Sequence, residues 1–175
     1  MRLLVFLVLN VTTPFAWTQS IDLGYGMTIT GKVVPFDSTV RTITRCNVFD
    51  WEFQPVCLID GKPFFGQDLD SALPRMELAS LSVSTDGKEV ALDISGMFNP
   101  NGYAELRSDQ FKVVQADGFN AFEIIGLFSD GAGTYVAVWK VMAGGSIRTL
   151  ISGSEIEIVH WWHDVPYQTN EPENR

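Results

Sequence analysis

The sequence predicts an all-β protein, a single-domain antiparallel β-sandwich or barrel that is built from hairpins and contains little helix. Asp-Gly pairs recur along the chain, and such pairs readily supply the positive φ angles of tight hairpin turns. The pairs are Asp60-Gly61, Asp86-Gly87, Asp117-Gly118 and Asp130-Gly131. Apolar and polar residues alternate beside several of these pairs, as in half-buried strands. Apolar residues nowhere keep a helical period over three turns, and the best helical segment is a short one at 104–109.

Residues 1–18 are predicted to be a secretory signal peptide. Arg2 supplies one positive charge, the apolar stretch 3–11 follows, and small residues come next. The apolar stretch is too short to span a membrane. The small residues predict a mature chain that starts between residues 17 and 21, and no cysteine follows for a lipid anchor, so no membrane anchor is expected in the mature chain. The alternative is that the segment is retained as a buried first strand.

The rest of the chain is assigned to an all-β domain at 19–163 and a flexible polar tail at 164–175. Removing the leader takes away Arg2 and no acidic residue, so 11 basic residues face 21 acidic ones and the formal charge becomes −10. Such a surface repels phosphate backbones, which disfavours nucleic acid and anionic lipid as partners. A basic protein would be attracted to it.

The clearest hairpin is "LSVSTDGKEVALDI", residues 81–94. Apolar and polar residues alternate on both sides of its Asp-Gly pair, which predicts one apolar face and one polar face. The segment 111–128 repeats this scheme with a longer turn, and 27–48 suggests another pair of strands. A shorter version lies at 57–65, where Pro63 indicates a sheet edge.

The segment "GLFSDGAGTYVAVWKV", residues 126–141, could be a phosphate-binding loop or a hairpin turn. A mononucleotide loop needs a Gly-Lys-Ser/Thr ending, which is missing here, and Val136 occupies the third glycine position of the dinucleotide pattern. The stretch 135–141 is apolar on nearly both sides, which is typical of a strand in the middle of a fold. We therefore expect a hairpin tip at 129–134, a central strand with Trp139 buried, and a returning strand at 147–151.

Cys46 and Cys57 are the only cysteines of the chain. In an oxidising compartment such a pair predicts a disulfide, and the alternative is a weak metal site with two thiol ligands.

The segment "IEIVHWWHD", residues 156–164, holds both histidines and two of the five tryptophans. We interpret it as a strand, on which successive side chains point to opposite faces. His160 would then pack at the edge of the core, and His163 would lie on the other face. His160, His163 and Asp164 are ligand types that suit zinc. Because the strand would separate the two histidines, no metal site is predicted.

Trp161 or His163 is expected to decorate the outer face of this segment. An exposed Trp161 would be a suitable anchor for a protein partner or a sugar ring. We favour the other interpretation, that both tryptophans of the segment complete the hydrophobic core.

The candidate binding residues are therefore Asp130 and Thr134 at the hairpin tip, and Trp161 and His163 near the carboxyl end. No catalytic residue is proposed, because no Gly-x-Ser-x-Gly motif occurs and both histidines lie in one cluster. No cofactor is expected. The only Asn-x-Ser/Thr acceptor, Asn10, lies in the leader, which favours a bacterial export route.

These observations favour an exported bacterial, non-enzymatic binding protein. An inhibitor or immunity-type protein that acts on a basic envelope enzyme, such as a cell-wall hydrolase, would have this small, acidic, disulfide-bearing form. The alternative is an extracytoplasmic hydrolase whose carboxylates converge only in the fold. A cleft lined by two close carboxylates would favour that alternative.

Overall fold

The computed structural model describes residues 16–46, 55–67, 73–101, 105–115 and 121–165. Of the predicted leader it describes only 16–18, and of the predicted tail only Asp164 and Val165. The expected turn at Asp117-Gly118 lies outside the described residues.

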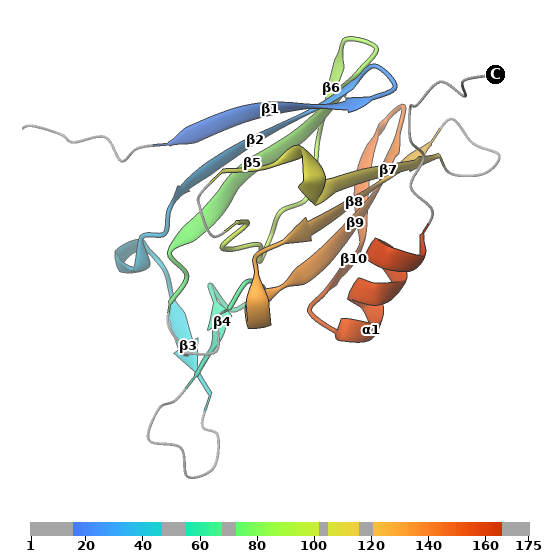
Figure 1. The fold of residues 1–175 in the computed structure, drawn as a ribbon. Coiled ribbons are helices and arrows are strands. Elements are labelled where there is room, and N and C mark those ends of the chain that lie inside the picture. Colours follow the sequence, from blue (N-terminus) through green and yellow to red (C-terminus); the bar gives the residue numbers. More distant parts are fainter. Residues whose placement is uncertain (1–15, 47–54, 68–72, 102–104, 116–120, 166–175) are drawn as a thin grey trace, which may run out of the picture.

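The described strands form two four-stranded antiparallel sheets that face each other (Figure 1). One sheet has the order β1-β2-β5-β6, with β1 (Trp17–Gly24), β2 (Met27–Pro35), β5 (Met76–Thr85) and β6 (Lys88–Ala91). The other has the order β10-β9-β8-β7, with β7 (Phe111–Gln115), β8 (Phe122–Phe128), β9 (Tyr135–Met142) and β10 (Gly145–Ser152). The all-β prediction is confirmed, and two separate sheets make the fold a sandwich.

A smaller two-stranded sheet pairs β3 (Ile43–Arg45) with β4 (Val56–Ile59). In the chain, both strands follow β2 and precede β5. The predicted disulfide is confirmed here, since Cys46 and Cys57 are joined with their Cα atoms 5.5 Å apart. The strands expected within 27–48 exist as β2 and β3, but they lie in different sheets because β3 pairs with β4.

Short helical segments complete the described chain. They are η1 (Ser38–Val40), η2 (Ser108–Gln110), η3 (Gly131–Gly133), α1 (Glu155–Ile158) and its continuation η4 (Val159–Asp164). Of the segment 104–109, the best helical candidate, residue 104 lies outside the described residues, and only Ser108 and Asp109 are helical, within the single turn η2.

The Asp-Gly turns work as predicted at two positions. Asp86 and Gly87 join β5 to β6 with φ angles of 50° and 70°, and Asp60 and Gly61 follow β4 with 52° and 73°. Positive φ at both residues is the signature of the turn type that suits a two-residue hairpin.

Residues 129–134 form the predicted hairpin tip between β8 and β9. The backbone geometry of this tip differs from expectation, because Asp130 is extended, with φ −145°. The positive φ angles belong to Ser129 and Gly131. In this longer tip, which includes the turn η3, the first residue with a positive φ angle is Ser129, one residue before the expected Asp130.

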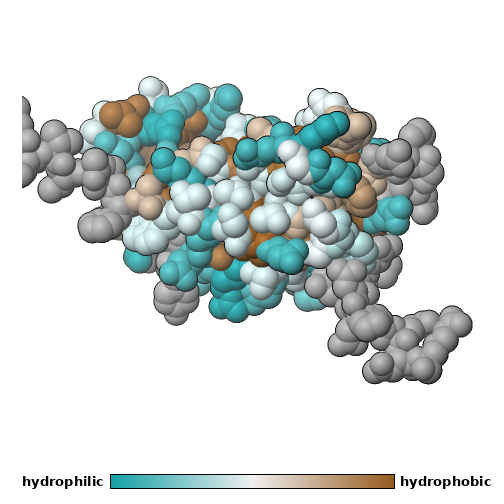
Figure 2. Space-filling model, turned by 90° about the horizontal axis from the view of Figure 1, so that it is seen from above, coloured by the Kyte–Doolittle hydropathy of each residue, from teal (hydrophilic) through white to brown (hydrophobic). Residues whose placement is uncertain are grey.

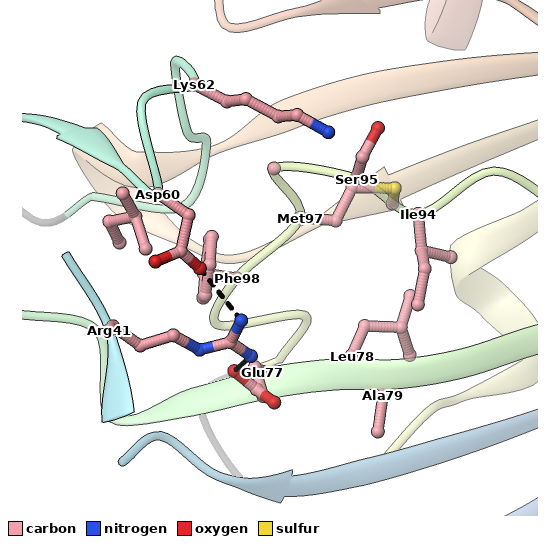
Figure 3. A pocket seen from close by; sticks show the side chains of 12 residues that line it. Arg41, Asp60, Lys62, Glu77, Leu78, Ala79, Ile94, Ser95, Met97 and Phe98 are labelled. Carbon is pink, nitrogen blue, oxygen red and sulfur yellow. Dashed lines mark hydrogen bonds and ion pairs between the residues drawn. The ribbon is translucent and has the colours of Figure 1, made fainter. Parts of the chain in front are cut away.

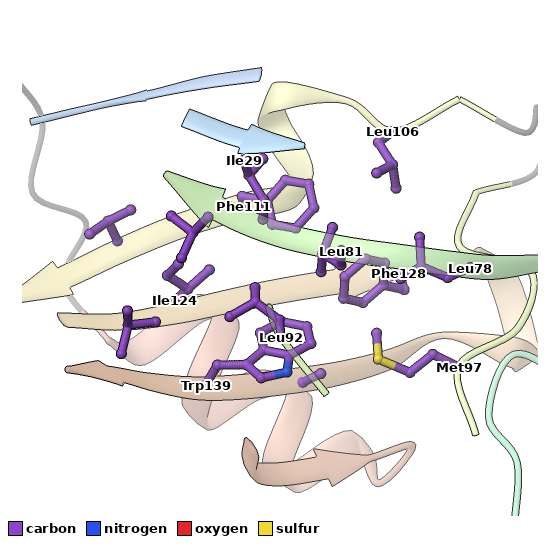
Figure 4. Close-up of a cluster of buried hydrophobic side chains, with 14 of the residues drawn as sticks. Ile29, Leu78, Leu81, Leu92, Met97, Leu106, Phe111, Ile124, Phe128 and Trp139 are labelled. Carbon is purple, nitrogen blue, oxygen red and sulfur yellow. The ribbon is translucent and has the colours of Figure 1, made fainter. Parts of the chain in front are cut away.

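Aromatic and aliphatic side chains from both sheets fill the space between them (Figure 4). Trp139 is fully buried, as predicted, and its Nε1–H donates to the carbonyl oxygen of Asp93 at 2.8 Å. Phe128 stacks on Tyr135 and meets Trp139 edge to face. The hydrogen bond to Asp93 satisfies the polar atom of the indole and so offsets the cost of removing it from water.

The outer face of the second sheet carries a second hydrophobic cluster. Ile125, Val136 and Val138 are buried there beneath the carboxyl-terminal helix. The helix packs Ile158, Trp161 and Trp162 against this cluster, and Val165, just after the helix, packs there too. Our interpretation of 156–164 as a strand is therefore wrong: these side chains follow helical spacing, and they cover the outward side of β9.

Lys112 of β7 holds the end of this helix against the sheet. Its ammonium donates to the carbonyl oxygen of Trp162 and lies 4.5 Å from the centre of the Trp162 ring. Burial lowers the pKa of Lys112. The contact combines a charge-assisted hydrogen bond with a cation–π interaction.

Candidate functional site

The four predicted binding residues lie in two places. Asp130 is exposed at the hairpin tip, and Thr134 donates its hydroxyl to the carbonyl oxygen of Gly131 at 2.8 Å. Trp161 and His163 lie on η4. The tip approaches the start of the carboxyl-terminal helix, because a Cβ on Gly153 would lie 3.6 Å from the carbonyl oxygen of Thr134. Among the described residues, no hydrogen bond, ion pair or ring contact joins the two pairs.

Trp161 is half-buried against the second sheet, whereas His163 is exposed. His160 is also exposed, so our expectation that it packs at the core edge is wrong. The reason is the helical backbone, which turns His160 away from the sheet that Trp161 contacts. The rings of His160 and Trp161 still meet edge to face, with their centres 5.3 Å apart.

The solvent side of this helix is acidic and partly apolar, and we call it the helix face. Ile156 is 79% exposed and Val159 is 42% exposed. A shallow groove of about 540 Å³ runs along the helix face, lined by Glu155, Ile156, Glu157, Val159, His160 and Asp164. The segment 155–164 contains no lysine or arginine. The helix face therefore presents apolar side chains in a negative surround.

A second hollow, which we call the end pocket, lies beside β5 near the turn that follows β4 (Figure 3). It encloses about 320 Å³. The lining residues come from four segments and are Arg41, Ile59, Asp60, Lys62, Glu77, Leu78, Ala79, Ile94, Ser95, Gly96, Met97 and Phe98. Their side chains combine an apolar floor with charged groups around it.

Arg41 connects two carboxylates of the end pocket. Its Nη1 donates to Asp60 at 2.9 Å and its Nη2 to Glu77 at 2.7 Å. Asp60 also accepts from the backbone N–H of Thr42 at 2.8 Å. This N–H, and then the guanidinium of Arg41, hold the pKa of Asp60 below its ordinary value. Among the described side chains, Nε of Arg41 is the only buried polar atom without a hydrogen-bond partner.

On the other side of the end pocket, Lys62 extends its ammonium toward Ser95 (Figure 3). Behind Ser95, Arg148 donates to its carbonyl oxygen at 2.8 Å and lies 3.4 Å from the carboxylate of Asp93. Burial acts to raise the pKa of Asp93, but hydrogen bonds from Ser95 and the charge of Arg148 bring it below its ordinary value. These contacts fix the loop that forms this wall.

The two carboxylates of the end pocket are a poor acid–base pair. A general acid needs a raised pKa, whereas Asp60 has a lowered one because it accepts hydrogen bonds in its charged form. Asp60 and Glu77 are held by the same guanidinium, as in a structural ion-pair network. Within the described ranges, no group of three His, Cys, Asp or Glu residues is placed to hold a metal ion.

Comparisons with known proteins return no match to a family model, a curated protein or a solved structure. No helix in the described part of the chain is long and apolar enough to cross a membrane. Seen from above, the surface is largely hydrophilic, and its hydrophobic residues form small, separate patches (Figure 2).

Sequence reasoning missed both the helix face and the end pocket. A signal for the helix was present, because Ile158, Trp161, Trp162 and Val165 stand at i, i+3, i+4 and i+7. Ser154 and Glu157 also have the spacing of a capping box. No local pattern marks the end pocket, since the Arg41–Glu77 ion pair joins residues 36 positions apart.

Proposed function

We propose that this protein is an exported bacterial binding protein without catalytic activity, and that its helix face binds a basic protein partner such as a cell-wall hydrolase. The observation that carries the proposal is Ile156, which is 79% exposed between Glu155 and Glu157. Together with Val159, which is 42% exposed, it forms an apolar patch rimmed by acidic side chains, and such a patch is typical of an interaction surface.

The composition of the helix face suits a partner of opposite charge. Exposed Ile156 and Val159 supply apolar area to desolvate, while Glu155, Glu157 and Asp164 surround them with negative charge. Interfaces commonly pair such an apolar centre with a polar rim, and complementary charge speeds association and selects the partner. The formal charge of −9 for the whole chain extends this field over the molecule.

A titration of a purified basic cell-wall hydrolase against this protein tests the proposal. We expect a complex whose affinity falls as salt rises, together with slower hydrolysis of the wall substrate. Ile156→Glu should weaken the complex by about tenfold or more, because it places a charge in the apolar centre.

Ile147→Glu is the matched control, since Ile147 is 55% exposed on β10 and lies outside the helix face. It should leave the affinity unchanged. The proposal fails if basic hydrolases form no complex even at low salt, or if the two substitutions weaken the complex equally.

Export is part of the proposal, and the position of β1 sharpens it. Trp17 and Thr18 pair with Val33 and Lys32 of β2. Cleavage after Ala16 would leave these pairs intact, whereas cleavage after Thr18 or Ser20 would remove part of the strand. Amino-terminal sequencing of exported protein should therefore find Trp17 first. A chain that still begins at Met1 would contradict export with cleavage.

A further inference from the structure

We infer that the end pocket binds a small zwitterion with an apolar body, namely an aliphatic amino acid or a dipeptide of such residues with free termini. The inference concerns a site separate from the helix face and does not depend on the partner proposed above. Three features of the end pocket carry it: its floor, its two open charged groups and its charge balance.

The floor is apolar and preformed. Ile59, Leu78, Met97 and Phe98 line the end pocket and are each buried in the fold. A volume of about 320 Å³ stands at the lower end of the range for small-molecule sites, which is roughly 300–1,000 Å³. A ligand of this size is limited to one or two amino-acid residues, and its aliphatic side chain would rest on this floor.

Two charged groups on opposite sides of the end pocket have capacity for a ligand (Figure 3). The ammonium of Lys62 makes no hydrogen bond or ion pair with any described residue, and it points across the pocket toward Ser95. Oε2 of Glu77 accepts a hydrogen bond from Arg41, while Oε1 of Glu77 accepts from no described residue. Lys62 can therefore bind a carboxylate at one end of the ligand, and Glu77 can bind an ammonium at the other.

The charges around the end pocket balance. Arg41, Lys62 and Arg148 are positive, and the three carboxylates that face them are Asp60, Glu77 and Asp93. Lys62 acts on both Asp60 and Asp93, where its charge contributes to lowering their pKa values. A ligand with a net charge would upset this balance, whereas a zwitterion can place each of its charges beside an opposite one.

Calorimetric titration of the full protein with Leu-Leu and with leucine tests the inference. We expect saturable binding of at least one of them, and which one binds more tightly gives the length of the ligand. Lys62→Met should weaken binding by about 10- to 100-fold, because a charge-assisted contact to the carboxylate is lost. Acetylation of the ligand's amino group should weaken binding by a similar factor.

Two variants make the test specific. In Glu77→Gln, which keeps an acceptor for Arg41, the free and acetylated ligands should bind alike. Lys88→Met, at the Asp86-Gly87 turn and outside the end pocket, removes the same charge as Lys62→Met and should bind as wild type does. Ile156→Glu should also leave this binding unchanged, which separates the end pocket from the helix face.

Three results would overturn the inference: no saturable heat with either ligand, equal losses in Lys62→Met and Lys88→Met, or hexanoate binding as tightly as the better zwitterion. The last result would show that the end pocket recognises a simple carboxylate and that Glu77 has no part in binding.

Discussion

The two sheets of the sandwich differ in what lies outside them. In the first sheet, residues of β5 alternate between core and exterior: Leu81 and Val83 are buried, and Ser82 and Ser84 face outward. In the second sheet, β9 is apolar on both sides, with Trp139 directed into the sandwich and Val138 outward beneath the helix. A strand pattern thus reports not only which face meets the core, but also whether anything covers the other face.

The difference explains why the carboxyl-terminal segment must be helical. The outward cluster of Ile125, Val136 and Val138 needs a cover that satisfies its own backbone hydrogen bonds, since the sheet beneath it offers only side chains. A helix does this, and its apolar side then packs on the cluster. Its opposite side is the helix face.

The largest effect should come from the core between the sheets, which both share. Trp139→Ala should lower the free energy of unfolding by about 3–5 kcal/mol, because it leaves a large cavity and removes the closer of two donors to the Asp93 carbonyl oxygen. Urea denaturation followed by circular dichroism measures this. A loss below about 1 kcal/mol would mean that the sheets do not pack on this ring.

The next effect tests the covered outer face. Val138→Ser should cost about 2–4 kcal/mol, because it loses buried methyl groups and places a hydroxyl among apolar neighbours. The same denaturation experiment applies. Stability equal to wild type would show that the helix leaves this face open to water.

The strand β9 and the turn between β5 and β6 could both be predicted from the sequence. The central position of β9 was predictable because seven consecutive residues, 135–141, carry the evidence together. The turn at Asp86-Gly87 was predictable because the dipeptide itself sets the backbone angles. Both are local, and local chemistry decided them.

The helix was mistaken for a strand because the apolar residues of 156–165 fit both a strand period and a helix period. Ile156, Ile158, His160 and Trp162 alternate as in a strand, while Ile158, Trp161, Trp162 and Val165 fit a helix. Only the need to cover β9 decides between them, and that need comes from tertiary structure.

The end pocket is less predictable still, because Arg41, Lys62 and Glu77 come to line one pocket only once the sheets are assembled.

Trp161 tests whether the cover is held by aromatic packing. Trp161→Ala should cost about 1–3 kcal/mol, less than Trp139→Ala, because the Trp161 ring is only half-buried. Denaturation with far-ultraviolet circular dichroism would report stability and helix content together. Unchanged stability combined with lost partner binding would instead identify Trp161 as an anchor for a partner.

A smaller effect, dependent on pH, is expected at the end pocket. Since the folded state holds the pKa of Asp60 below its value of 3.8 in the unfolded chain, Asp60 stabilises the fold above that pH. This contribution is lost as the pH falls through the lower, folded-state pKa. The stability difference between wild type and Asp60→Asn should therefore shrink in acid, and denaturation at neutral and at strongly acidic pH measures it. A constant difference would show that Asp60 is not held as an ion by Thr42 and Arg41.

The smallest effect comes from reversing the Val138 exchange on the other sheet. Ser84 lies on the outward side of β5 between Thr28 of β2 and Glu89 of β6, and it is partly exposed. Valine suits a partly exposed strand position at least as well as serine, so Ser84→Val should change the free energy of unfolding by about 0.5 kcal/mol or less. Together with Val138→Ser, this variant tests the same pair of side chains on the two outer faces, with burial as the main difference. Equal and opposite effects would mean that residue type alone determines stability at both positions. A loss at Val138 with near-neutrality at Ser84 would assign the difference to the helix, which covers one outer face and leaves the other to water.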